Sequence, residues 1–385
     1  MVYLPMKRIA IVSPYKGYNY GTVLQAYALQ RKIEEFGFDA EYLQFSPQIH
    51  SSRWKKILRK ALSFVRPNKK HVKNVGLDDY SFFYTPDFRE FVKGFDYFIS
   101  SRIKESETRF NPDSLRKCRD YVAYIVGSDQ TWGEGRTLKN PIYFLNYIDE
   151  RYPRFSYAPS IGTTHISQEY LKVLRENLPR FQFLSCRELT NCKLLSKEIG
   201  RDVSYVLDPT LLLTSEEWNQ IAEKHPDESL KKKQYILCYI LGEKKSISDY
   251  AEKLGKEKSL PVYYIVTRPL YLKKEKHIFA TPETFLGLVR DADTVITDSF
   301  HGTIFSINFN TQFYSFTKRE NDANVKDRDN DRIVEILQNF DLSNRYREKD
   351  FKIETDIDYI QINQILKENR KKSLQYIDRM LSFIK

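Results

Sequence analysis

The sequence predicts an α/β protein of two lobes, each built from a parallel β-sheet covered by helices on both faces. Three observations support this fold class. Short apolar runs alternate with amphipathic segments along most of the chain, its 385 residues suit two domains of ordinary size, and a 41% hydrophobic content is enough for two cores. Strands buried on both faces are typical of parallel sheets, which explains why the apolar runs are nearly continuous.

The first half of the chain opens with a β-α-β unit. We expect a strand over 7–13, a helix over 22–36 that ends at Gly37, and a strand over 40–45. The pattern is interrupted at about residues 47–118, which we interpret as a basic helical insertion. It resumes with further strands and helices: strands over 121–126, 154–158, 181–186 and 203–207, and helices over 168–178 and 188–199.

The second half repeats the same alternation of strands and helices. Its expected strands cover 234–241, 262–266, 294–297 and 312–316, and its expected helices cover 247–258, 282–291, 301–308, 332–339 and 357–383. We therefore predict an N-terminal lobe over 1–208 and a C-terminal lobe over 209–385. Ligands of such sheets bind beyond the carboxyl ends of the strands and, in two-lobed forms, between the lobes.

The formal net charge of +11 comes mostly from residues 53–73, which hold nine Lys or Arg and no acid. The rest of the chain is close to neutral, so we do not expect nucleic-acid binding. Six apolar residues of this segment have the spacing of one helical stripe: Trp54, Ile57, Leu58, Ala61, Leu62 and Val65. Two interpretations stay open, peripheral contact with an anionic membrane and a helix packed on the N-terminal lobe with a solvated basic face.

The cysteines and the apolar runs indicate where the protein resides. Cys118, Cys186, Cys192 and Cys238 are scattered without a CxxC pair, so we expect reduced thiols. No apolar run approaches about 18 residues, and the first one is too short for a secretion signal. We therefore expect a cytoplasmic protein.

Polar clusters directly follow four of the predicted strands, where helix N-termini offer free N–H groups to anions. Each cluster taken alone could be a tight turn, a helix cap or a local ion pair. Their recurrence at one edge of two sheets favours a shared binding site. The candidate residues are Asn19, Tyr20, Gly21, Ser128, Asp129, Gln130, Arg187, Ser299, His301, Gly302 and Thr303.

Several common site motifs are missing from the sequence. There is no P-loop or GxGxxG, which argues against binding of a nucleoside triphosphate or dinucleotide. There is also no HExxH and no paired-carboxylate motif, so we expect neither a catalytic metal nor glycoside cleavage.

Six segments resemble, in this order, the polysaccharide pyruvyl transferase family between about residues 8 and 340: NYGTVLQAYALQ, VGSDQTW, SYAPSIG, SCRE, VLDPTLLL and TDSFHGTIFSINFNTQFYSF. The resemblance implies two Rossmann-like lobes facing a cleft, as in GT-B glycosyltransferases. It also implies transfer of pyruvate from phosphoenolpyruvate to sugar hydroxyls, which forms a pyruvate ketal on a capsular or other surface polysaccharide. The acceptor could also be a lipid-linked precursor at the inner face of the cytoplasmic membrane. Phosphoenolpyruvate would be the donor substrate, without a further cofactor.

The resemblance also implies roles for individual residues. Ketal formation needs a proton delivered to the enol CH2, and a group with a pKa near neutrality suits this step. His301 is therefore the first choice for donor binding or proton transfer. Arg187 is expected to bind the donor's phosphate or carboxylate, and Asp129 to orient the acceptor hydroxyl. Lys318 and Arg319 are further candidates for the anion pocket.

One position departs from the family pattern. Better-characterised branches carry R-x-H-G, and here Ser299 occupies the place of the arginine. Lys318, Arg319 or Arg268 could supply the missing charge, or the donor could differ. Two other functions therefore stay open. One is a GT-B glycosyltransferase using a nucleotide sugar, with Glu283 as the candidate ribose ligand, and the other is a non-catalytic sugar-binding homologue.

Overall fold

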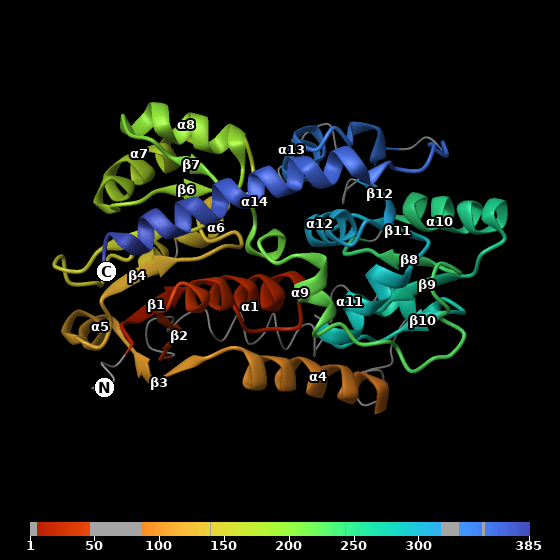
Figure 1. Cartoon of the computed structure of the whole chain (residues 1–385), viewed down its shortest axis with the longest axis horizontal. Coiled ribbons are helices and arrows are strands. Elements are labelled where there is room, and N and C mark those ends of the chain that lie inside the picture. The colour runs from red at the N-terminus through yellow and green to blue at the C-terminus, as the bar shows by residue number, and fades with distance from the viewer. Residues whose placement is uncertain (1–5, 47–85, 139, 243, 317–330, 349–350) are drawn as a thin grey trace.

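Two parallel β-sheets organise the protein into two lobes, which Figure 1 shows side by side. The computed structural model describes residues 6–46, 86–138, 140–242, 244–316, 331–348 and 351–385. The predicted basic helix of residues 53–73 lies outside these ranges, as do Lys318 and Arg319. The alternation of strands and helices agrees with the predicted α/β class.

The N-terminal sheet has five strands, and all neighbouring strands are parallel. In spatial order they are β3 (Glu105–Phe110), β2 (Asp39–Phe45), β1 (Arg8–Val12), β4 (Ala123–Val126) and β5 (Arg154–Ser156). The order of strands reverses at β1, which pairs with β2 on one side and β4 on the other. A small parallel pair, β6 (Ser185–Cys186) and β7 (Ser204–Tyr205), continues this lobe.

The helices of the N-terminal lobe cover this sheet, and several of them begin just after the loops at the strand ends. They are α1 (Tyr20–Glu35), α4 (Pro86–Arg102), α5 (Pro112–Lys117), α6 (Glu134–Thr137), α7 (Gln168–Asn177), α8 (Leu189–Ile199) and the 3-10 turns η3 (Pro141–Phe144) and η4 (Leu178–Arg180). Helix α1 begins two residues before the predicted start, because the side chain of Asn19 caps it and accepts a hydrogen bond from the backbone N of Thr22 at 3.1 Å.

The C-terminal sheet has six parallel strands. In spatial order they are β10 (His277–Ile278), β9 (Val262–Ile265), β8 (Ile236–Tyr239), β11 (Thr294–Thr297), β12 (Gln312–Phe316) and β13 (Tyr346–Arg347). Every residue of β8 and β11 is buried, as expected for central strands of a sheet covered on both faces. Here too the order reverses, between β8 and β11, and ligands of such sheets bind at this kind of point.

The remaining helices cover the C-terminal sheet and connect the lobes. They are η5 (Pro209–Leu211), α9 (Ser215–Asn219), α10 (Lys245–Lys258), η6 (Pro269–Lys273), α11 (Pro282–Asp291), α12 (Phe300–Asn308), α13 (Asp331–Asn339), η7 (Ser343–Arg345) and α14 (Tyr359–Ser382). Figure 1 shows α14 lying across both lobes. Its Tyr376 hydroxyl donates to Ser156 O at 2.9 Å, and the Ser373 hydroxyl accepts from Leu207 N at 3.0 Å.

The two lobes meet through an aromatic and ionic interface. The ring of Tyr20, in α1, stacks on Phe285 of α11 with centroids 4.2 Å apart, and its hydroxyl donates to Ala280 O at 2.9 Å. Lys32 contacts Glu217 across the same interface at 2.5 Å. Because Tyr20 is almost fully buried, these contacts stabilise one relative position of the lobes around α1.

Residues 86–118, which we interpreted as the second part of an insertion, belong to the N-terminal lobe. They form α4, β3 and α5, and β3 pairs with β2 as the edge strand of the sheet. The sequence of β3, ESETRF, is polar because three of its residues face solvent, and a polar edge strand lacks the apolar signal of a central one. Two phenylalanines of α4, Phe95 and Phe98, are fully buried.

The structure also revises the state of two cysteines. Cys186, at the end of β6, and Cys192, in α8, form a disulfide with Cα atoms 5.9 Å apart. The prediction of reduced thiols is therefore wrong for this pair, because the turn from strand to helix brings the two side chains together. Cys118 and Cys238 are free and buried.

Candidate functional site

Loops that follow strands of both lobes bring five polar residues together, and we call them the inter-lobe cluster: Ser128, Asp129, Arg187, Asp208 and His301. Asp208 lies at its centre. Its carboxylate accepts from Arg187 Nη1 at 2.6 Å and from Ser128 Oγ at 3.0 Å, and it lies 3.9 Å from His301 Nε2. The strand-end residues Ser128, Asp129, Arg187 and His301 thus come together as predicted. Asp208 is an additional member that was not predicted.

Arg187 is a buried cation with unused hydrogen-bond donors. Its side chain is 1% exposed, and its Nε and Nη2 have no hydrogen-bond partner. Burial opposes the charge, but the carboxylates of Asp208, Glu188 and Asp129 outweigh it and raise the pKa of Arg187. Its guanidinium also lies over the ring of Phe300, 4.6 Å from the centroid. Spare donors on a buried guanidinium suit a carboxylate or phosphate ligand.

Asp129 is held in an unusual backbone conformation directly after β4. Its φ of 71° lies in the left-handed region, and its carbonyl accepts from Thr131 N at 2.7 Å and Ser160 N at 2.9 Å. Its carboxylate lies 3.5 Å from Arg136. Burial favours the neutral acid, but the positive charges of Arg136 and Arg187 outweigh it and lower the pKa of Asp129 to about 2. Asp129 is therefore ionised at neutral pH.

His301 lies in the first turn of α12 and contacts the other lobe. An added Cβ at Gly21 would lie 2.0 Å from its Nδ1, so the ring packs directly on the backbone of α1. Its Nε2 is buried without a hydrogen-bond partner. Burial lowers the pKa of His301 to about 4, despite the opposing effect of Asp208. This imidazole is therefore neutral at neutral pH, so the expected role of a general acid requires that a bound group raise the pKa of His301.

The remaining polar residues of the TDSFHGT segment build the start of α12. Ser299 is its N-cap and accepts from Gly302 N at 3.4 Å, while the Thr303 hydroxyl donates to Ser299 O at 3.1 Å. Gly302 fits closely against Thr297 and Tyr239, where a Cβ would clash. Ser299, Gly302 and Thr303 thus hold the turn that presents His301.

Apart from the backbone N–H of Gln130, which hydrogen-bonds to the Asp129 carboxylate, the other predicted binding residues are not joined to the cluster by a described contact. Asn19 caps α1, Tyr20 belongs to the lobe interface, and Gln130 packs against Gly162. The proposed ribose ligand Glu283 forms an ion pair with Arg102 at 3.2 Å. Arg268, considered as a substitute for the missing family arginine, donates from Nε to Leu241 O.

Sequence reasoning missed Asp208 as a site residue. It stands directly after the predicted strand over 203–207, so the strand-end rule applied to the other clusters would have found it. Asp208 also caps η5, because its carboxylate accepts from Thr210 N at 3.0 Å. Burial opposes its charge, but Arg187 and His301 outweigh it and lower the pKa of Asp208.

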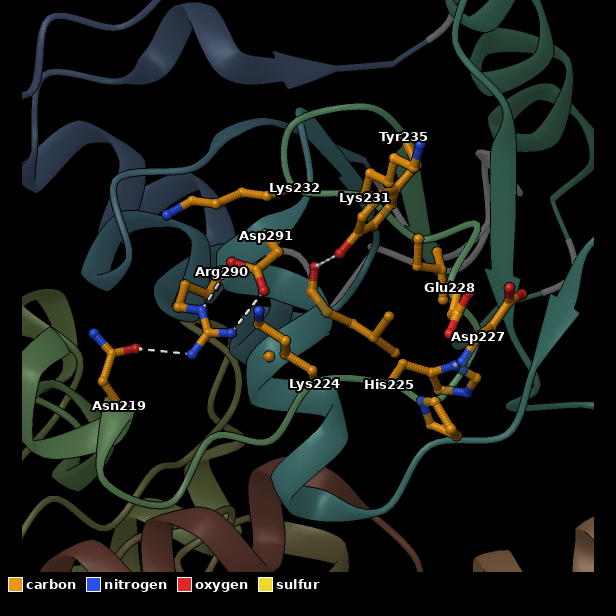
Figure 2. A pocket seen from close by; sticks show the side chains of 14 residues that line it. Asn219, Lys224, His225, Asp227, Glu228, Lys231, Lys232, Tyr235, Arg290 and Asp291 are labelled. Atoms are coloured by element: carbon orange, nitrogen blue, oxygen red, sulfur yellow. Dashed lines mark hydrogen bonds and ion pairs between the residues drawn. The ribbon is translucent and has the colours of Figure 1, made fainter.

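A cavity of about 730 Å³ lies on the C-terminal lobe, away from the cluster residues (Figure 2). Its walls include Lys224, Lys231 and Lys232, together with Arg290, which pairs with Asp291 at 2.6 Å. Tyr235 also lines the cavity and directly precedes β8. The cavity therefore lies toward the amino end of that strand. None of the predicted site residues within the described ranges lines it.

Metal-binding clusters and membrane-spanning helices are absent from the part of the chain that the structure describes. Within it, no group of three or more His, Cys, Asp or Glu side chains is arranged to hold a metal ion. Within the same ranges, no helix combines the length and apolar character needed to cross a membrane.

Comparison with solved structures confirms the fold. A protein described as a UDP-N-acetylglucosamine 2-epimerase from Listeria monocytogenes is 11% identical, with a TM-score of 0.51 over 98% of this chain and 95% of that one. MnaA from S. aureus, in a co-structure with UDP, is 10% identical, with a TM-score of 0.50 over 97% and 90%. SnogD, a glycosyltransferase from Streptomyces nogalater, is 9% identical, with a TM-score of 0.47 over 99% and 100%. At such identities the likeness concerns the fold alone.

Comparison with protein families is more specific. No curated protein sequence matches the chain significantly. One family model, described as polysaccharide pyruvyl transferase, matches residues 19–318, a range that includes all five residues of the inter-lobe cluster. The fold prediction of two Rossmann-like lobes of the GT-B type is confirmed, and the chain belongs to the polysaccharide pyruvyl transferase family.

Proposed function

We propose that the protein transfers pyruvate from phosphoenolpyruvate to hydroxyls of a saccharide, forming a pyruvate ketal on a surface polysaccharide or its lipid-linked precursor. Family membership indicates a transferase that acts on saccharides. The observation that carries the finer proposal is the Arg187 guanidinium, buried beside His301 with two nitrogens that lack hydrogen-bond partners. Phosphoenolpyruvate carries a phosphate and a carboxylate, the two groups that guanidinium donors bind best.

The proposed reaction balances without a redox step. One sugar hydroxyl adds to C2 of the donor, and its proton is delivered to the enol CH2, which becomes CH3. The bond between C2 and the phosphate oxygen then breaks. The second hydroxyl adds to C2 and closes the ketal ring, and its proton leaves with the phosphate.

The cluster residues suit distinct parts of this reaction. A neutral His301 can accept the first hydroxyl proton and pass it to the CH2 carbon. Binding of an anionic donor beside it would raise the pKa of His301 and so favour the protonated form during the transfer. Asp129, ionised and fixed by its backbone, is assigned to orient the acceptor hydroxyl. No metal or further cofactor is assigned to this scheme.

The test compares phosphoenolpyruvate with UDP as ligands and follows phosphate release with a saccharide acceptor. Phosphoenolpyruvate should raise the unfolding temperature, whereas UDP should not. His301→Gln should lower the rate of phosphate release about 10²- to 10⁴-fold, the usual range for loss of a proton-transfer group. The matched control is His277→Gln, at an exposed position in β10, which should keep the wild-type rate.

Stabilisation by UDP but not by phosphoenolpyruvate would contradict the proposed donor and favour a nucleotide-sugar transferase. Stabilisation by saccharides alone, without phosphate release, would favour the non-catalytic homologue. A near-wild-type rate for His301→Gln would remove this residue from the mechanism.

A further inference from the structure

A second arginine lies beside the inter-lobe cluster, on an element that is distant in the sequence. Arg332, near the start of α13, places its guanidinium carbon 5.5 Å from the centroid of the Phe300 ring, the same ring that Arg187 approaches at 4.6 Å. The two guanidinium carbons therefore lie no more than about 10 Å apart. This separation is short enough for one small molecule with two anionic groups to contact both.

Arg332 is buried, and its positive charge lowers the pKa of His301. The residue is 8% exposed, so its charge is poorly screened by water. Burial is the largest cause of the lowered pKa of His301, and the positive charges of Arg187 and Arg332 lower it further. Arg332 is therefore close enough to the histidine to influence any charge bound there.

The position of α13 is fixed against the N-terminal lobe by a second residue of the same helix. Glu335, one turn after Arg332, accepts hydrogen bonds from the backbone N of Leu189 and, at 3.2 Å, of Thr190. These are the first residues of α8, two and three positions after Arg187. A carboxylate at a helix N-terminus is favourable, so this contact stabilises α13 next to Arg187.

We propose that Arg332 is the second cation of the donor site and takes over the role of the arginine that Ser299 replaces in the family motif. This inference rests on the proposed function. Arg187 and Arg332 together bind the phosphate and the carboxylate of the donor, one group each, near His301. Ser299 is then free to cap α12, which it does through Gly302 N.

The test measures the KM for phosphoenolpyruvate and for the acceptor in Arg332→Gln and Arg332→Lys. Loss of one charge-assisted contact should raise the KM for phosphoenolpyruvate roughly 10- to 100-fold. The KM for the acceptor should stay within about 2-fold. Arg332→Lys, which keeps the charge but not the planar fork, should fall between the wild type and Arg332→Gln. Protection against thermal unfolding by phosphoenolpyruvate should follow the same order.

Arg347→Gln is the matched control, because this arginine is also 8% exposed and lies 5.0 Å from the centroid of Tyr314, and its ion pair is with Glu354, outside the inter-lobe cluster. It should leave both KM values unchanged.

An Arg332→Gln variant with a wild-type KM for phosphoenolpyruvate would overturn the assignment of Arg332 and leave the proposed function intact. A wild-type protein that neither binds nor turns over phosphoenolpyruvate would overturn the proposed function and this assignment together. If Arg332→Gln does not fold, a wild-type KM in Arg332→Lys overturns the assignment, and a raised KM supports it.

Discussion

Gly21→Ala adds one methyl group at the contact between the lobes, where it meets the His301 ring. We expect this variant to lose much of its activity and little of its stability. The new Cβ would lie 2.0 Å from His301 Nδ1, and an ordinary contact begins near 3.4 Å, so the ring must move by about 1.4 Å. A displacement of this size is expected to lower kcat/KM on the order of 100-fold. Overpacking costs about 1–3 kcal/mol of unfolding free energy, partly offset by the gain of up to about 1 kcal/mol from alanine in a helix.

The assay for Gly21→Ala is phosphate release from phosphoenolpyruvate, run beside thermal unfolding of the same samples. Gly135→Ala is the matched control, since a Cβ added at Gly135, in α6, meets no atom within 4 Å. It should keep the activity, with an unfolding temperature equal to or slightly above that of the wild type. A Gly21→Ala protein with kcat/KM within about 3-fold of the wild type would refute the reasoning, because the ring packed on α1 could not then be the catalytic arrangement.

Three further predictions concern charge and covalent structure. Asp208→Asn should lower the free energy of unfolding by about 3–5 kcal/mol in urea titrations, because it leaves the buried Arg187 without its nearest carboxylate; a loss below about 1 kcal/mol would contradict the pairing. Between pH 6.5 and pH 4 the unfolded His301 binds a proton and the folded one does not, since burial lowers its pKa to about 4. Stability should therefore fall by roughly 3 kcal/mol as the pH drops through this range, and His301→Gln should lack this part of the slope. Alkylation of the denatured, unreduced protein should label Cys118 and Cys238 alone, and labelling of all four cysteines would contradict the disulfide.

The central elements of the fold could be predicted from the sequence because their apolar patterns are strong. The helix over 282–291 and the strands over 294–297 and 312–316 have the predicted bounds. The short edge strands β10 and β13 were missed, since two residues give no periodicity. The edge strand β3 was also missed. Its sequence is polar because the strand is exposed, and a polar sequence of this kind is also typical of a loop.

The candidate site was predictable only where a residue stands next to a strand. Arg187, Asp129 and His301 were found this way, and Asp208 could have been. Arg332 could not, because it lies within a helix and reaches the site through the packing of α13 on α8, a contact between distant parts of the chain. The stacking of Tyr20 on Phe285 likewise depends on how the two lobes meet, which no local pattern reveals.

The course of α14 has a consequence for how the protein is made. Phe383, just after this helix, covers Phe155 and Phe183 of the N-terminal lobe, with ring centroids 6.1 Å and 5.9 Å away. During synthesis these two rings emerge from the ribosome about 200 residues before their cover does, since nascent chains fold from the N-terminal side onward. The first lobe therefore emerges while the Phe383 side of these two rings is still exposed. Translation pauses in the second lobe should therefore promote aggregation through these two rings.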